Sequence, residues 1–83
     1  MSSEKFLDAQ GLLCPLPILR ARKILNTLSA GDVLRIRATD AGALRDFPLF
    51  CEQTGHSLTG ISQNDDGVIE ILIRAAGAPP SEA

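Results

Sequence analysis

The apolar residues of this chain recur at two different spacings, and the order of these spacings limits the fold more than any other feature. Segments with strand character and segments with helical spacing alternate along most of the chain. The strand segments are 4–9, 33–40, 58–63 and 68–74, and the helical segments are 15–29 and 40–55. The sequence therefore predicts the element order β-α-β-α-β-β.

The first helical segment has one clear apolar face. Ile18, Ala21, Leu25 and Leu28 recur at helical spacing, with Ile24 on the flank, and Gly31 marks the end. On this register the basic side chains of the segment point to water. Two apolar side chains do the same, so four residues form an exposed face: Leu16, Leu19, Arg20 and Lys23.

The second helical segment has signals at both ends. Asp46 is suited to be its N-cap, Pro48 would lie in the first turn, and Gly55 is a natural C-terminal stop. An apolar stripe runs between them and includes Phe47, Phe50 and Cys51. Cys51 is therefore expected in the core. After this helix, residues 64–67 have a composition suited to a hairpin turn between the last two strands.

These elements predict an α/β (α+β) two-layer sandwich. A helix that connects two parallel strands makes a right-handed crossover, whereas the final hairpin is antiparallel, so the four-stranded sheet is mixed. The strand at 33–40 alternates apolar and polar residues, which leaves one sheet face wet. Both helices should therefore pack on the same face of the sheet.

The length of 83 residues and a hydrophobic content of 45% describe one small domain, which we place at 1–75. From Ala75 onward the composition offers nothing to bury, and residues 76–83 are predicted to be a disordered tail. The chain lacks a long apolar run and a signal-peptide pattern, which favours a cytoplasmic protein without a membrane contact. The net charge is −2, but six of the eight basic residues lie between Arg20 and Arg45. This distribution suggests an acidic partner rather than a nucleic acid.

Cys14 stands in the segment Gly11-Leu12-Leu13-Cys14-Pro15-Leu16-Pro17, at the start of the first helix. If Pro15 is the first helical residue, Cys14 is the N-cap and its sulfur lies at the positive end of the helix dipole. This position predicts a moderately lowered pKa of the thiol. Of the first three helical residues only Leu16 has an N–H to donate to the sulfur. Alternatively, the helix begins at Pro17 and Cys14 lies in a rigid, extended lead-in.

Several kinds of site are not expected at Cys14. His56 is the only histidine and lies some forty residues away, so a hydrolytic triad is not expected. There is no Cys-x-x-Cys pair, and two cysteines with one histidine are too few for a zinc site. We therefore expect no metal and no cofactor, and any group that Cys14 receives should pass to another protein.

The segment Leu7-Asp8-x-x-Gly11-Leu12-x-Cys14-Pro15-x-Pro17, followed by Gly31-Asp32, Thr39-Asp40, Arg45-Asp46-x-Pro48-x-Phe50-Cys51 and Gly55-His56-x-Leu58, resembles the TusA/SirA-like sulfur-carrier family. The resemblance covers residues 6–74. It implies the two-layer fold and gives Cys14 a role as carrier of a persulfide. The sulfur would come from a cysteine desulfurase or a rhodanese and pass to an accepting protein.

The same resemblance assigns supporting roles. Pro15, Pro17, Gly11 and Asp8 belong to the motif around Cys14, and the exposed face of the first helix would dock partners. By hypothesis, Asp8, Asp40 and Asp46 are turn and cap residues rather than proton-transfer groups. The carrier is expected to be a monomer or a weak dimer.

Leu16 stands where the member of the family that serves tRNA thiolation has a glutamate, and Ala41 replaces a common proline. The sequence of residues 14–23 looks closer to family members that serve sulfur oxidation or general sulfur relay. The pathway stays open among tRNA thiolation, molybdenum cofactor supply and sulfur oxidation. An alternative function is a non-catalytic module that regulates a desulfurase or a molybdenum enzyme. Direct RNA binding is the least expected, because the chain lacks Trp and Tyr for base stacking.

Overall fold

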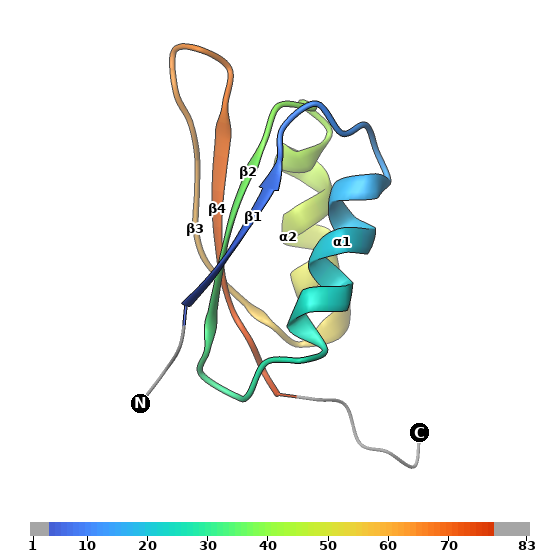
Figure 1. Cartoon of the computed structure of the whole chain (residues 1–83), viewed down its shortest axis with the longest axis vertical. Helices are drawn as coiled ribbons and strands as arrows, with labels where there is room; N and C mark the ends of the chain where they lie inside the picture. The colour runs from blue at the N-terminus through green and yellow to red at the C-terminus, as the bar shows by residue number, and fades with distance from the viewer. Residues whose placement is uncertain (1–3, 78–83) are drawn as a thin grey trace.

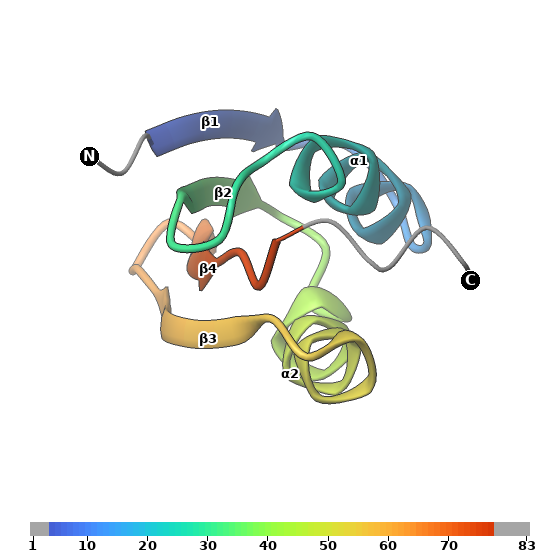
Figure 2. The same ribbon diagram turned by 90° about the horizontal axis from the view of Figure 1, so that it is seen from below.

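Two helices lie side by side on one face of a four-stranded sheet, and the opposite face of the sheet is open (Figure 1, Figure 2). The structure, a computed structural model, describes residues 4–77. Its elements in chain order are β1 (Glu4–Ala9), α1 (Leu16–Leu25), β2 (Val33–Ala38), α2 (Ala43–Thr54), β3 (Ser57–Gln63) and β4 (Ile69–Arg74). The predicted order β-α-β-α-β-β and the two-layer architecture are confirmed.

The sheet is mixed, with the strand order β1-β2-β4-β3. β1 and β2 are parallel and are connected through α1, whereas β4 runs antiparallel to both β2 and β3. Parallel neighbours end at the same edge of a sheet. The segments that follow β1 and β2 therefore meet at one end of the molecule, at the top of Figure 1.

The core lies between the sheet and the two helices. Its largest fully buried side chains come from both layers: Leu25, Leu34, Ile36, Phe47, Ile69, Ile71 and Ile73. The inward positions of β2 and β4 are those expected from the alternation of apolar residues. Cys51 is buried beside Phe47 and Phe50, as predicted, and this burial raises the pKa of its thiol.

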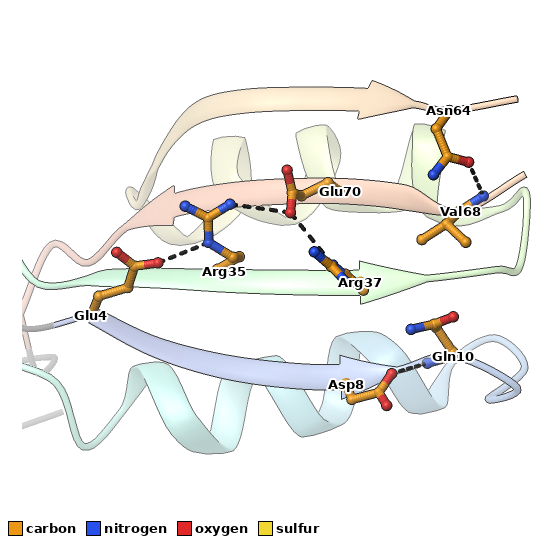
Figure 3. Close-up of polar contacts among 8 residues, drawn as sticks. All are labelled: Glu4, Asp8, Gln10, Arg35, Arg37, Asn64, Val68 and Glu70. Atoms are coloured by element: carbon orange, nitrogen blue, oxygen red, sulfur yellow. Dashed lines mark hydrogen bonds and ion pairs between the residues drawn. The ribbon is translucent and has the colours of Figure 1, made fainter. Parts of the chain in front are cut away.

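The open face of the sheet carries a line of alternating charges (Figure 3). Arg35 bridges Glu4 at 2.8 Å and Glu70 at 3.1 Å, and Glu70 also contacts Arg37 at 3.5 Å. The Arg37 guanidinium lies over the exposed ring of Phe6, 5.8 Å from its centroid. The wet second face that the sequence predicts is thus confirmed.

Helix α1 differs from its predicted extent. It ends at Leu25 rather than near residue 29, and residues 26–28 continue as turns that keep Leu28 buried. Pro17 takes the first buried position of the helix, whereas Ile18 is only partly buried.

The prediction that Asp46 caps α2 is wrong. The helix begins at Ala43, so Asp46 lies within its first turn and Pro48 lies inside the helix. The earlier start has two local causes: the side chain of Ala43 is buried, and Asp40 accepts a hydrogen bond from the N–H of Gly42. Gly55 ends α2 in the left-handed conformation at φ +87°, as predicted.

Packing continues beyond β4, which corrects the expectation that nothing is buried from Ala75 onward. Ala75 is buried, its N–H donates to the carbonyl of Asp32, and its own carbonyl accepts from Gly31. The N–H of Ala76 donates to Nδ1 of His56 at 2.9 Å. Most of the predicted tail, 78–83, lies outside the described residues. Within 4–77, neither helix has the length and apolar character needed to cross a membrane.

Candidate functional site

Cys14 lies in the loop between β1 and α1, and its side chain is exposed. The connection between β2 and α2 lies at the same end of the molecule (Figure 1). Residues that are distant in sequence therefore reach the cysteine from a second loop and from the first turn of α2.

The backbone of the Cys14 loop is fixed to the neighbouring connection. The N–H of Cys14 donates to Oδ2 of Asp40 at 2.7 Å, while the other oxygen of this carboxylate accepts from Gly42 at 3.1 Å. These two N–H groups hold the pKa of Asp40 below its usual range. A second link joins the N–H of Gly11 to the hydroxyl of Thr39 at 2.9 Å. Both bonds position Cys14 relative to the start of α2.

The thiol of Cys14 donates a hydrogen bond to a carboxylate. Sγ lies 3.3 Å from Oδ2 of Asp46. This bond raises the pKa of Cys14 above its usual value, with further contributions from desolvation and from the negative charges of Asp46 and Asp40, whereas Arg45 opposes the change. The prediction of a lowered pKa at Cys14 is therefore wrong.

The start of α1 explains why the helix dipole does not stabilise a thiolate. Pro15 is the N-cap residue and Leu16 is the first residue of the helix, so Cys14 lies one position outside the cap. The Cys14–Pro15 peptide bond is cis. The N–H of Leu16 donates to the carbonyl of Leu13 at 2.8 Å and not to the sulfur. Neither predicted start, at Pro15 or at Pro17, is the observed one.

The residues expected to support the motif have separate structural roles. Gly11 adopts a positive φ of 83° in the turn after β1, and Asp8 accepts a bond from the N–H of Gln10 at 3.1 Å (Figure 3). Pro17 is buried and Pro15 is exposed. Asp8 and Asp40 act in turns, as hypothesised, but Asp46 contacts the sulfur itself.

A shallow groove of about 260 Å³ opens between α1 and α2 beside the sulfur. The groove is lined by Cys14, Pro15, Ile18, Arg22, Asp46, Leu49, Phe50 and Gln53. Its floor is partly apolar, and the guanidinium of Arg22 lies over the ring of Phe50, 5.6 Å from the centroid. The groove offers a partner an apolar contact next to the cysteine.

The predicted docking residues Leu16, Leu19, Arg20 and Lys23 are all exposed on α1. None of them lines the groove, which takes Ile18 and Arg22 from the same helix instead. The sequence analysis did not select Leu13 and Leu49, which are 70% and 48% exposed. The exposure of Leu49 could have been found, because it lies off the apolar stripe that includes Phe47, Phe50 and Cys51.

The described part of the chain, 4–77, holds no group of three or more His, Cys, Asp or Glu side chains that could bind a metal ion. His56 bonds to Ala76, so its imidazole is engaged away from the sulfur. The chemistry of this site is therefore that of one exposed thiol, with one carboxylate bound to the sulfur and another bound to the backbone N–H of the same residue.

The sequence profile described as Sulfurtransferase TusA matches residues 5–75. The chain belongs to the TusA sulfurtransferase family. The matched TusA region spans all six elements of the fold, from within β1 to just past β4.

Relatives in the TusA family bear names that agree with this assignment. The chain is 52% identical over 68 residues to the sulfur carrier protein TusA of Allochromatium vinosum, covering 82% of this chain and 88% of that protein. It is 44% identical over 68 residues to the sulfur carrier protein TusA of Pseudomonas entomophila, covering 82% and 84%. These similarities support a sulfur carrier role for this TusA family member.

A crystal structure of a SirA-like protein from Desulfitobacterium hafniense has the same fold. The TM-score is 0.76 at 32% sequence identity, and the match covers 86% of this chain and 96% of that one. The resemblance to TusA and SirA-like proteins inferred from the sequence is thus confirmed. A sulfur carrier needs a protein that gives sulfur and one that accepts it, so the TusA family implies at least two partners.

Proposed function

We propose that Cys14 accepts sulfane sulfur as a persulfide from a donor protein and relays it to an accepting protein. The observation that carries this proposal is the placement of the exposed Cys14, whose backbone is fixed by Asp40 while its sulfur faces solvent beside the groove. Cys51 is unsuited to the same role because it is buried. A cysteine at the rim of a compact body can enter the site of a larger enzyme.

The proposed transfer needs no external oxidant. The Cys14 sulfur attacks the outer sulfur of the donor's cysteine persulfide, and a new S–S bond forms on Cys14. The S–S bond of the donor breaks, its electron pair remains on the donor cysteine, and the thiol proton of Cys14 leaves to solvent or to the donor thiolate. We expect the donor to be a cysteine desulfurase or a rhodanese, and the relay to take place in the cytoplasm, where thiols stay reduced.

The test is the mass of the intact protein after incubation with a cysteine desulfurase and cysteine. The wild type should gain one sulfur atom, and Cys14→Ala should gain none. Cys51→Ala is the matched control and should gain sulfur as the wild type does. No gain in the wild type, or a gain that persists in Cys14→Ala, would contradict the proposal.

A cellular assay separates this function from the regulatory alternative. If the protein only docks on a desulfurase or a molybdenum enzyme, Cys14→Ser should bind that partner and support growth as the wild type does. If Cys14 carries sulfur, Cys14→Ser should retain binding and lose function.

A further inference from the structure

Three charged groups act on Cys14 from the elements packed around it, and a fourth lines the groove beside it. Asp46 and Arg45 come from α2, Asp40 comes from the connection before α2, and Arg22 comes from the far side of the groove. The carboxylates are the closer pair: one contacts the sulfur at 3.3 Å and the other contacts the N–H at 2.7 Å. The sulfur therefore lies in a locally acidic setting, which the charge of Arg45 only partly offsets.

The negative charge of Asp46 is only loosely paired. Its Oδ1 lies 3.7 Å from Nε of Arg45, and the Arg45 side chain is 89% exposed. Exposed pairs of this length contribute little and are screened by salt. The Asp46 side chain is itself 22% exposed, so a group on a partner can reach it.

This arrangement is unusual for a nucleophilic cysteine. The thiolate, not the thiol, attacks sulfur. However, the bond from Sγ to Asp46 exists only while the thiol keeps its proton. The same bond orients Sγ toward α2 and the groove, where a partner would dock.

We propose that Asp46 is a positioning residue that keeps the sulfur-free carrier as a neutral thiol until a cationic side chain of the sulfur donor pairs with it. The proposal rests on the proposed function and names the chemistry of the donor surface: an arginine or lysine beside its persulfide. In the complex this cation neutralises Asp46, and Cys14 loses its proton to solvent. The resulting thiolate takes the outer sulfur, and the bonding pair of the broken S–S bond stays on the donor cysteine.

The first half of the proposal is tested by the rate of Cys14 alkylation with iodoacetamide across pH. Asp46→Asn keeps the size of the side chain and removes its charge, so alkylation near neutral pH should accelerate at least about threefold, because below the pKa one unit changes the thiolate fraction about tenfold. Arg45→Gln should slow alkylation. Glu52→Gln, which removes a charge from an exposed position on the same helix, should leave the rate unchanged.

An unchanged or slower alkylation of Asp46→Asn overturns the proposal. Arg45 is almost fully exposed, so Arg45→Gln tests the same electrostatic balance even if Asp46→Asn folds poorly. Asp46→Glu, which keeps the charge, should restore slow alkylation. A purely structural role of Asp46 would not shift the pH profile in opposite directions for these variants.

The second half is tested by single-turnover loading of Cys14 from a persulfidated cysteine desulfurase at low and high salt. At low salt Asp46→Asn should load at least about threefold more slowly than the wild type, although it alkylates faster, and the difference should disappear at high salt. Equal acceleration of loading and alkylation would show that Asp46 only restrains the thiol, and would overturn the role of the donor cation. If the wild type acquires no sulfur, the proposed function and the donor cation both fail, whereas the alkylation rates still decide the effect of Asp46 on the thiol.

Discussion

The amide of Cys14 and the carboxylate of Asp40 are joined by a 2.7 Å hydrogen bond across 26 positions of sequence. The bond ties the loop after β1 to the loop after β2. The position of Cys14 thus depends on a residue that is remote from it in the chain.

Asp40→Asn should reduce stability in a way that depends on pH. Two N–H groups lower the pKa of Asp40 in the folded state, so its contribution is present above the unfolded value of about 3.8 and is lost as pH falls through the folded value. Urea unfolding of both proteins should show a gap near pH 7 that shrinks below about pH 4. A gap that is the same at both pH values would contradict this account.

Protonation of His56 on mild acidification should destabilise the fold. Burial lowers its pKa below the usual value of 6.5, and its Nδ1 accepts the N–H of Ala76, which a protonated imidazole cannot do. The contribution is therefore present above about pH 6.5 and is lost as pH falls through the folded value. His56→Asn places an amide oxygen near the same position without a titratable group, so its urea midpoint should vary less between about pH 7.5 and pH 5.5 than that of the wild type.

Substitution by alanine should have different effects on stability at Gly55 and at Gly60. Gly55 has φ +87° at the end of α2, so Gly55→Ala should cost about 1 kcal/mol although no atom lies in the way of a Cβ. Gly60 has no such dihedral angle, and a Cβ there would make an ordinary contact with Leu72 at 3.5 Å. Gly60→Ala should change the free energy of unfolding by less than about 0.5 kcal/mol. Urea denaturation of both variants compares the two effects, and an equal loss in both would contradict the argument from φ.

The ion pairs on the open face of the sheet should contribute little to the free energy of unfolding. Glu70 joins Arg35 and Arg37, but these side chains are all at least a third exposed. Glu70→Gln should therefore lower the free energy of unfolding by less than about 1 kcal/mol at low salt. The difference from the wild type should vanish at about 1 M salt. A larger loss that persists at high salt would mean that Glu70 acts through packing.

Leu49 should matter for sulfur loading and not for the fold. It is exposed on α2 and lines the groove with Cys14, so Leu49→Asp should slow loading from a desulfurase by about fivefold or more. Leu44→Asp is the matched control, because Leu44 is also exposed on α2 but does not line the groove. The alkylation rate of Cys14 shows whether the sulfur stays accessible. Equal loading of both variants would remove the groove from the docking surface.

The fold could be predicted largely from spacing, because apolar side chains of strands and helices report directly which face is buried. Ile69, Ile71 and Ile73 alternate in the sequence and are fully buried in the structure. The boundaries were less predictable. Asp46 is a residue type favoured at N-caps, but the N–H of Gly42, four residues after β2, donates to Asp40, and the helix begins at Ala43 instead.

The site was predictable only in part. Cys14 could be singled out from its local sequence, since a cysteine followed by Pro15 and Pro17 at the predicted start of a helix is an unusual setting for a core residue. The charge state of its thiol could not be predicted, because the decisive neighbour, Asp46, is 32 positions away in the sequence. Local reasoning about the helix dipole gave the opposite sign for the pKa change of the thiol, since the Leu16 N–H is already bonded to Leu13.

The strand order has a consequence for synthesis on the ribosome. β4 is the last strand to emerge, yet it lies between β2 and β3 and supplies three fully buried isoleucines. The sheet cannot close while β4 is still within the exit tunnel, so the domain folds after translation of this strand rather than stepwise. Until then, the carboxylates of Asp40 and Asp46 are not fixed beside Cys14, and the nascent chain exposes a thiol without these hydrogen bonds.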